Sequence, residues 1–292
     1  MPVKTTTYVV PPRSTNGGCL YLVATPIGNL EDITYRAVRV LSECDLVACE
    51  DTRQTRKLLD HYGIKKPMLS CHEHNEAARG RLIVDKLTQG LNVALVSDAG
   101  TPMISDPGYR VVAEAAGAGF QVIPIPGPSS VLAALAASGL PVDRFRFVGF
   151  LPSRQNERRR ALEALREEST TVIVFEAPHR ILDSLEAIAE LLGDRRLVLA
   201  REVTKLHEEF LRGTATQIRA TLASRASVRG EITLLIGPAP EIAVAPTEQE
   251  VRAEFDASLA QGMGRMDAIK HVARRWKLGK RDVYRIVEGG SA

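Results

Sequence analysis

The stretch Val96-Ser-Asp-Ala-Gly-Thr-Pro-Met-Ile-Ser-Asp-Pro-Gly108 decides how the surrounding chain folds. It follows the apolar run Asn92-Val-Ala-Leu-Val96, and residues 106–118 carry apolar side chains at helical spacing. A short apolar strand, a polar loop with Gly and Pro, and an amphipathic helix form one repeat of a parallel α/β sheet. Right-handed crossovers place the carboxyl ends of such strands on one edge, where ligands bind in open α/β sheets. We therefore expect this stretch to be a ligand-binding loop.

The same repeat occurs on both sides of this loop. Apolar runs at 20–24, 45–49, 92–96 and 121–125 predict strands, and the segments 32–41, 53–61, 75–89 and 106–118 predict helices. Continuous apolar strands that alternate with amphipathic helices indicate a parallel sheet covered on both faces. The loops at 25–29, 50–53 and 126–130 should then meet residues 96–108 at one rim. Turn formation alone explains any one such loop, but four together favour a binding site.

A second α/β unit is expected after Ser138. Strands are predicted at 144–150, 171–175, 197–200 and 231–236, and helices at 156–168 and 178–192. A Pro-rich linker spans 237–246, and beyond it Ala268, Ile269, Val272, Ala273 and Trp276 fall on one helical face. A turn at 277–280 and a second helix give a helix-turn-helix outline, which any helical hairpin shares. The expected organisation is a disordered tail (1–18), two α/β domains (19–127 and 128–240) and a basic helical module (247–292).

Composition is that of an ordinary globular protein, with 45% apolar and 25% charged residues and a net charge of +3. Between Arg265 and Arg285, however, Lys and Arg greatly outnumber Asp and Glu, which is either a nucleic-acid surface or a solvated helical face. The four Cys residues show no pairing pattern and are expected to be small buried side chains in a reducing compartment. No apolar run is long enough for a membrane span and no signal-peptide core is present, so a cytoplasmic protein is expected.

Several common motifs are missing from the sequence. There is no GxGxxG, no GxxxxGK[ST] and no GxSxG, so the usual dinucleotide, P-loop and hydrolase signatures do not apply. The segment Cys71-His-Glu-His74 lacks a second ligand cluster, and no metal site is expected. Patterning therefore indicates a two-domain α/β protein with a cleft lined by acids and Gly/Pro loops.

Longer motifs carry a family resemblance. They are Leu22-Val-Ala-Thr-Pro-Ile-Gly-Asn-Leu-Glu-Asp-Ile-Thr34, Glu50-Asp-Thr-Arg53, Val96-Ser-Asp-Ala-Gly-Thr-Pro102, Ile104-Ser-Asp-Pro-Gly108, Pro126-Gly-Pro-Ser-Ser130 and Phe175-Glu-Ala-Pro-His-Arg180. In these motifs the chain resembles the tetrapyrrole methylase superfamily, and within it the branch that methylates the RNA of the small ribosomal subunit. The resemblance runs from about Cys19 to Gly237, and the basic tail also fits it.

The resemblance implies a fold, a cofactor and a substrate. The fold would be a parallel-sheet N-terminal domain and a mixed-sheet second domain, hinged near Gly127 to Ser130, with a small C-terminal helical module. S-adenosylmethionine (SAM) would bind between the two domains and donate its methyl group to the 2′-hydroxyl of a cytidine in the decoding region of 16S rRNA, on the 30S subunit. A homodimer is implied as well. Relatives that act on tetrapyrroles carry a GxGxG-like first loop and a GDP-type third loop, and this chain has neither.

The resemblance also implies which residues contact the cofactor: Pro26, Ile27, Ser97, Asp98, Ala99, Thr101, Ser129, Ser130, Glu176 and Ala177. The chemistry is compatible with this assignment. Asp98 would favour the positive groups of SAM, although a loop-capping aspartate is the simpler alternative, and Ser hydroxyls both donate and accept hydrogen bonds.

Methyl transfer to a ribose hydroxyl needs alignment, a dry cleft, and a base or cation near the oxygen. Arg201, Glu202, Lys205 and Glu176 are the candidate catalytic residues, and Asp51, Asp106 and Glu231 are further acids that leave the base unassigned. An ordinary interdomain ion-pair network would explain the Arg201–Lys205 stretch nearly as well. Asp106 either caps the next helix or faces the substrate.

RNA contacts are expected from cations that seek phosphates. The candidates are Arg53, Arg154, Arg158, Arg159, Arg180, Lys270, Arg274, Arg275, Lys277, Lys280 and Arg281. Two rival hypotheses remain at this point. One is a carbon methyltransferase that acts on a corrin or porphyrin precursor, and the other is a non-catalytic rRNA-binding assembly factor with a vestigial cleft.

Overall fold

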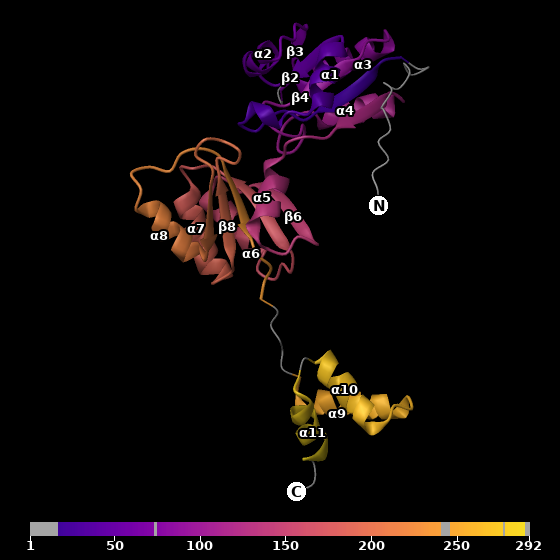
Figure 1. Ribbon diagram of the computed structural model, residues 1–292, viewed down its shortest axis with the longest axis vertical. Helices are drawn as coiled ribbons and strands as arrows, with labels where there is room; N and C mark the ends of the chain where they lie inside the picture. The colour runs from indigo at the N-terminus through magenta and orange to yellow at the C-terminus, as the bar shows by residue number, and fades with distance from the viewer. Residues whose placement is uncertain (1–16, 73–74, 241–245, 277, 290–292) are drawn as a thin grey trace. The chain divides into compact units, whose positions relative to one another are not determined.

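The computed structural model describes residues 17–72, 75–240, 246–276 and 278–289. The chain divides into two compact units after Ala239 (Figure 1). The first unit contains two five-stranded sheets, and the second is made of helices. Of the expected tail, 1–18, only Gly17 and Gly18 lie within the described residues. The domain boundaries expected within 19–240 remain predictions.

The first sheet is parallel throughout, as predicted. Its strands are β1 (Cys19–Val23), β2 (Leu46–Cys49), β3 (Met68–Ser70), β4 (Val93–Val96) and β5 (Gln121–Ile125). They lie in the order β3-β2-β4-β1-β5, so β4 and β1 are central. The edge strand β3 was not predicted, because three residues are too short for a recognisable apolar run.

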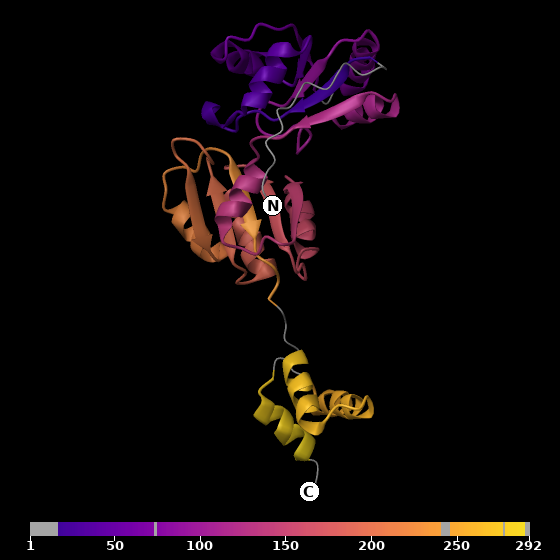
Figure 2. The ribbon, with the colours of Figure 1, turned by 45° about the vertical axis from the view of Figure 1, so that its right-hand side comes forward.

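Helices cover both faces of this sheet (Figure 2). Helices α1 (Tyr35–Glu43) and α2 (Thr52–His61) pack on one face, and α3 (Glu76–Thr88) and α4 (Tyr109–Gly117) pack on the other. Alternate residues of a strand serve the two faces, since Val47 belongs to the first cluster and its neighbour Ala48 to the second. The four cysteines are buried and free, as expected, and burial raises the pKa of Cys44 to about 11.

The second sheet is mixed, as the resemblance implied. Its strands are β6 (Phe145–Phe150), β7 (Thr171–Glu176), β8 (Leu197–Arg201), β9 (Glu209–Gly213) and β10 (Ile232–Ile236), in the order β6-β7-β10-β8-β9. Only β6 and β7 pair in parallel, and the other pairs are antiparallel.

The two faces of the second sheet have different neighbours. Helix α5 (Ser130–Ser138) packs on one face, together with Ile27 from the first sheet's β1 loop. Helices α6 (Gln155–Glu163), α7 (Ile181–Leu192) and α8 (Ala215–Ala223) pack on the other. Strand β9 and helix α8 were not predicted, although the Thr214/Gln217 capping box marks where α8 begins.

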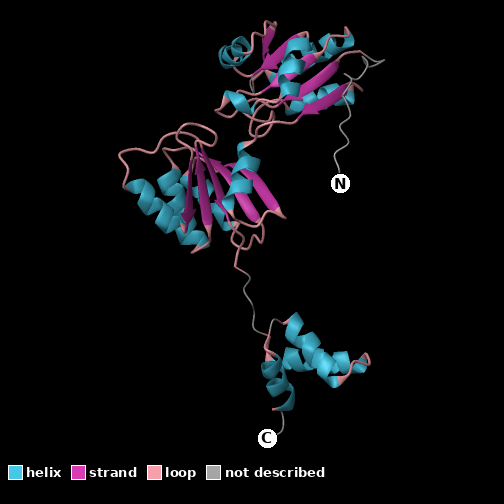
Figure 3. Cartoon of the chain, viewed as in Figure 1, coloured by secondary structure: helices cyan, strands magenta, loops and turns pink. Residues whose placement is uncertain are grey.

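The C-terminal unit consists of α9 (Glu248–Ala260), α10 (Arg265–Arg275) and α11 (Lys280–Glu288) (Figure 3). Its core contains the predicted face of Ala268, Ile269, Val272 and Ala273, with Trp276 packed against it. Helix α9 was not predicted, even though Thr247 and Glu250 form a capping box at its start. Lys277 and linker residues 241–245 lie outside the described residues. Among the described residues, no helix has both the length and the apolar character needed to cross a bilayer.

Candidate functional site

A cavity of about 350 Å³ opens where the carboxyl ends of the first sheet's strands face the second sheet. This volume falls within the range of about 300–1,000 Å³ that is typical of small-molecule sites. The first sheet contributes Ile27 after β1, residues 99–101 and 104–106 after β4, and Ser129 after β5. The second sheet contributes the ends of β6 and β7, the start of β10, and Val203. The predicted rim therefore forms one wall of a cavity.

Three of the four predicted rim loops line this cavity, and hydrogen bonds hold them together. Thr25 and Gly100 exchange backbone hydrogen bonds of 2.9 and 3.0 Å, which join the β1 and β4 loops. Thr101 Oγ1 donates to the Pro128 carbonyl at 3.2 Å, which joins the β4 and β5 loops. The fourth loop, 50–53, does not line the cavity, but the Asp51 amide donates to Asp98 Oδ1 at 3.0 Å.

The loop between β4 and α4 has an unusual backbone. Met103 and Ser105 adopt positive φ angles of 71° and 67°, a conformation that costs about 1–3 kcal/mol for each such residue and clusters at functional sites. Helix α4 begins at Tyr109, so Asp106 does not cap it. Instead, Oε1 of the buried Glu76 accepts from the amides of Gly108 at 3.0 Å and Arg110 at 2.8 Å, and thereby anchors the end of the loop.

The structure brings most of the predicted cofactor residues to the cavity wall. Seven of them line it: Ile27, Ala99, Thr101, Ser129, Ser130, Glu176 and Ala177. Three do not. Pro26 is half-buried beside Ile27, Ser97 is buried with its hydroxyl directed at the carbonyls of Ala99 and Gly100, and Asp98 is exposed. Asp98 Oδ1 accepts a hydrogen bond from the Asp51 amide in the neighbouring loop.

Carboxyl groups gather along the rim of the first sheet. Burial, and then the charges of Asp106, Asp98 and Asp51, raise the pKa of Glu50. Burial also raises the pKa of Asp106, with a smaller contribution from Asp98, while the Ser97 hydroxyl opposes the change. Asp51 differs, because Arg53 donates to both of its oxygens and lowers its pKa to about 2. No group of three or more His, Cys, Asp or Glu side chains within the described residues is placed to hold a metal ion.

Glu176 lies on the cavity wall, but its carboxylate is bonded within the protein. Oε1 accepts from the Ala177 amide at 2.8 Å and from the Arg180 guanidinium at 2.7 Å, and Oε2 accepts from Ser184 Oγ at 2.5 Å. The side chain has no exposed surface. The carboxylate therefore orders the start of α7, and Arg180, a predicted RNA contact, is its partner.

The predicted catalytic residues Glu202 and Lys205 form an ion cluster with Glu231. Lys205 Nζ lies 2.8 Å from Glu202 Oε1 and 3.2 Å from Glu231 Oε2. Burial alone lowers the pKa of Lys205, but the two carboxylates raise it overall, and Lys205 lowers the pKa of Glu202. Gly28, at φ 149°, lies against the Lys205 stem so closely that a Cβ there would be 2.3 Å from Cγ. Val203, between these residues, lines the cavity.

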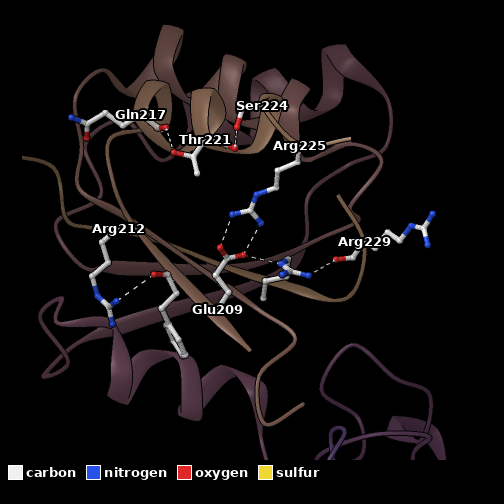
Figure 4. A network of polar contacts seen from close by, with 9 residues as sticks. Glu209, Arg212, Gln217, Thr221, Ser224, Arg225 and Arg229 are labelled. Carbon is white, nitrogen blue, oxygen red and sulfur yellow. Dashed lines mark hydrogen bonds and ion pairs between the residues drawn. The ribbon is translucent and has the colours of Figure 1, made fainter. Parts of the chain in front are cut away.

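A separate network of polar contacts surrounds Glu209 (Figure 4), and it includes Arg201. Its Nε donates to Glu209 Oε2 at 3.0 Å, and Arg225 donates to both Glu209 oxygens at 2.8 and 2.5 Å. These two guanidinium groups, Arg225 first, lower the pKa of Glu209 to about 2. Arg201 Nη1 also donates to the Arg229 carbonyl at 3.2 Å. Arg201 is therefore fixed at the end of β8 and does not line the cavity.

The predicted RNA contacts of the first unit are all bonded to other residues. Arg53, Arg154 and Arg159 are ion-paired with Asp51, Glu157 and Glu190. Arg158 was expected on a surface run, but it is 5% exposed and donates to the Ser153 carbonyl at 3.2 Å. Arg158, Arg159 and Arg180 line a second, polar cavity together with Asp183, Glu186 and Glu190.

The C-terminal unit presents a different set of cations. Lys270 pairs with Asp267, and Arg275 pairs with Glu254. Arg274, Lys280 and Arg281 are exposed and form no ion pair among the described residues. Lys280 and Arg281 occupy the first turn of α11, and Lys277 lies outside the described residues.

Sequence reasoning missed part of the cavity wall. Ile104, Ser105, Phe150, Gly230 and Thr233 line it without having been proposed. Ile104 and Ser105 lie inside the quoted loop, so the loop itself was the available signal. No sequence signal marked Phe150 or Thr233 as a wall residue, because both resemble ordinary strand residues.

Comparison with known proteins places this arrangement in a class. Residues 19–219 match the family model of the tetrapyrrole (corrin/porphyrin) methylases. The matched segment covers the first sheet, every strand of the second sheet except β10, and the cavity wall except Gly230, Glu231, Ile232 and Thr233. The chain therefore belongs to the tetrapyrrole methylase family.

The curated relatives narrow the class to one group, named ribosomal RNA small subunit methyltransferase I. The protein of that name from Halalkalibacterium halodurans is 46% identical over 274 residues, covering 92% of this chain and 94% of the relative. The one from Synechocystis sp. is 46% identical over 271 residues, covering 92% and 97%, and the one from Bacillus subtilis is 43% identical over 272 residues, covering 91% and 93%. The resemblance inferred from the motifs is confirmed.

Solved structures of lower identity share the fold. Uroporphyrin-III C-methyltransferase from Thermus thermophilus, complexed with S-adenyl homocysteine, aligns with a TM-score of 0.54 at 20% identity, covering 75% of this chain and 97% of the other. A diphthine synthase aligns with a TM-score of 0.57 at 15% identity, covering 75% and 90%. The predicted architecture of two α/β units is confirmed, and the predicted cofactor, SAM, is supported by family membership.

Proposed function

We propose that this chain uses SAM to methylate the 2′-hydroxyl of a cytidine ribose in the decoding region of 16S rRNA, on the 30S subunit. The observation that carries the proposal is the cavity. The cavity is lined on one side by the first-sheet loops that are expected to hold the cofactor, and on the other side by the second sheet. The chain that forms it is 43–46% identical to the three ribosomal RNA small subunit methyltransferases above.

The cavity residues fit the chemistry of the cofactor. Ile27, Val131 and Phe175 form an apolar wall, and Thr101 and Ser130 supply hydroxyls. When bound, SAM supplies an electrophilic methyl group on a sulfonium. Among the described residues, no Lys, Arg or His lines the cavity, while Asp106, Glu176 and Glu231 do. Such a wall favours a bound cation over an anion, which agrees with a sulfonium ligand.

The cluster of Glu202, Lys205 and Glu231 is proposed to position the target nucleotide. It lies at the cavity edge, where Val203 and Glu231 are wall residues. Arg201, held by Glu209, fixes the strand end from which the cluster projects. Glu176 is proposed to shape the cofactor wall rather than to take a proton, because its oxygens are already bonded.

RNA binding is proposed for the basic C-terminal unit together with the basic residues of the first unit. Exposed cations without carboxylate partners gain the most from a phosphate, because they give up no existing ion pair. Arg274, Lys280 and Arg281 meet this condition within the described part of the chain. The boundaries 19–127, 128–240 and 247–292 remain proposed functional divisions.

We also propose that the protein forms a homodimer and acts in the cytoplasm, where ribosomal subunits assemble. Strand β6 is an edge strand of the second sheet, and its side chains Phe145, Val148 and Phe150 are exposed. An apolar edge of this kind favours association with another chain. Equilibrium sedimentation of the full chain tests this proposal, and a monomer at micromolar concentration would contradict it.

The decisive experiment offers labelled SAM with 30S subunits, bare 16S rRNA or a porphyrinogen in parallel reactions. Nuclease digestion and mass spectrometry then locate the label. A 2′-O-methylcytidine formed in the 30S reaction supports the proposal, and label in the porphyrinogen indicates a tetrapyrrole substrate. A chain that binds 30S subunits but neither binds SAM nor transfers methyl would instead be a non-catalytic assembly factor.

A further inference from the structure

We propose that Asp106 is the catalytic base that accepts the proton of the substrate hydroxyl. This inference rests on the proposed function, and it assigns a step for which the sequence left several candidates. Among the titratable side chains of the cavity, Asp106 is the one that is neither ion-paired nor mostly exposed within the described residues.

Three ionisable residues line the cavity within the described part of the chain: Asp106, Glu176 and Glu231. Glu176 is fully buried, and its two oxygens accept from Ala177, Arg180 and Ser184. Glu231 is ion-paired with Lys205 at 3.2 Å, and its side chain is 74% exposed. A carboxylate that is bonded to a cation or open to water is a weaker base than one that is neither.

Asp106 differs from both of these residues. It is half-buried in the cavity wall and forms no ion pair with any described residue. Its polar neighbour is the uncharged Ser97 hydroxyl, which lowers its pKa by less than burial raises it. The charged group that raises its pKa is Asp98, which follows β4, and Asp106 in turn raises the pKa of Glu50, which follows β2. Both are carboxyl groups, and like charge at this edge favours proton uptake.

The backbone supports the same role. The positive φ angles of Met103 and Ser105 flank Ile104 immediately before Asp106, and Glu76 secures the loop on its far side. The loop is therefore held in a costly conformation that places Ile104, Ser105 and Asp106 together on the wall. Burial and the charge of Asp98 raise the pKa of Asp106, which brings its basicity closer to that needed near neutral pH.

The ribose hydroxyl gives its proton to a carboxylate oxygen of Asp106, while its oxygen forms a bond to the methyl carbon. The carbon–sulfur bond breaks, and its electron pair stays on sulfur as a neutral thioether. The carboxylate and the sulfonium thus lose their charges together, and Asp106 later releases the proton to water.

The test compares wild type, Asp106→Asn and Asp106→Glu of the full chain. Two readouts are used: single-turnover methyl transfer to 30S subunits, and calorimetric binding of S-adenosylhomocysteine. Asp106→Asn should slow transfer by about 10²–10⁴-fold, the usual contribution of general base catalysis, while the Kd stays within about fivefold. Asp85→Asn, an exposed change on α3, is the matched control and should match wild type in both readouts.

The pH dependence separates a base from a merely structural residue. The wild-type rate should fall tenfold for each pH unit below the pKa of Asp106, because only the carboxylate accepts the proton. Asp106→Asn should lose this acidic limb, and Asp106→Glu should keep it at a reduced rate. Since the loop is strained, Asp106→Glu also serves as the test variant if Asp106→Asn lowers the unfolding midpoint.

Three results would overturn the assignment: transfer by Asp106→Asn within about fivefold of wild type, survival of its acidic limb, or a loss of cofactor affinity that accounts for the whole rate loss. Failure of wild type to methylate RNA would instead refute the proposed function, and the assignment with it. The wild-type reaction therefore distinguishes the two failures.

Discussion

Replacing Glu209 by Gln should destabilise the first unit by an amount that depends on pH. Glu209 accepts hydrogen bonds from Arg201 and Arg225, and its side chain is 24% exposed (Figure 4). Its pKa is lowered from 4.5 to about 2. At about 1.4 kcal/mol for each pKa unit, this difference corresponds to ~3 kcal/mol of stability at neutral pH.

The sign follows from the direction of the shift. A carboxyl whose pKa is lower in the folded than in the unfolded state stabilises the fold above its unfolded pKa. That contribution is lost as pH falls through the folded value. The free energy of unfolding of Glu209→Gln should therefore lie ~2–3 kcal/mol below that of wild type at neutral pH. The gap should close between pH 4.5 and about 2.

Urea unfolding followed by circular dichroism measures this difference. The single tryptophan, Trp276, packs in the core of the C-terminal unit, so its fluorescence reports a region that the substitution does not touch. Glu163→Gln, an exposed change on α6, is the matched control and should cost less than ~0.5 kcal/mol. The reasoning fails if Glu209→Gln behaves like this control at neutral pH, or if its deficit persists unchanged in acid.

Three further predictions follow from other contacts. Gly28→Ala should lower the unfolding midpoint and slow methyl transfer, because the alanine Cβ would clash with the Lys205 side chain. Gly63→Ala, which is also at positive φ but faces open space, should leave methyl transfer unchanged. Equal transfer rates in the two variants would contradict this prediction. Deleting the chain after Ala245 should weaken 30S binding and reduce its salt dependence, with cofactor affinity retained, as filter binding and calorimetry would show. Glu76→Gln should cost ~1–3 kcal/mol in urea unfolding, because it weakens two hydrogen bonds to the start of α4, and a loss below ~0.5 kcal/mol would contradict this.

Local sequence patterns were sufficient to predict every strand of the first sheet except the edge strand β3. The central strands β1 and β4 are continuous apolar runs, and each is followed by a polar loop that contains Gly and Pro. Elements that depend on tertiary contacts have weaker sequence patterns than these apolar runs. Strand β9 reads Glu-Phe-Leu-Arg-Gly, and only its pairing with β8 and the bond from Arg201 to Glu209 define it as a strand.

The candidate site shows the same limit at the level of single residues. The motifs located the cavity loops, because a loop sequence is local information. They did not show which carboxylates are bonded. Glu176 and Asp106 look equally available in the sequence, yet Arg180 and Ser184 hold the first, and no described cation holds the second. Partners eight residues away or on another strand decide the role of a carboxylate, and no local pattern reports them.

The distribution of carboxyl groups gives the cavity two chemically different sides. On the second sheet, each acid near the cavity has a cation: Arg180 for Glu176, Lys205 for both Glu202 and Glu231. On the first sheet, Glu50, Asp98 and Asp106 form no ion pair with a described residue, and burial together with neighbouring carboxylates raises the pKa of Glu50 and of Asp106. A sulfonium and a proton are both stabilised by the first side, and a nucleotide can be oriented by the second. Methyl transfer to a hydroxyl removes the positive charge of the sulfonium and the negative charge of the carboxylate base. Because charge is lost, partial burial of an unpaired carboxylate favours the reaction. In a protein that only binds RNA, the same burial would lower the stability of the fold without any gain in reaction rate.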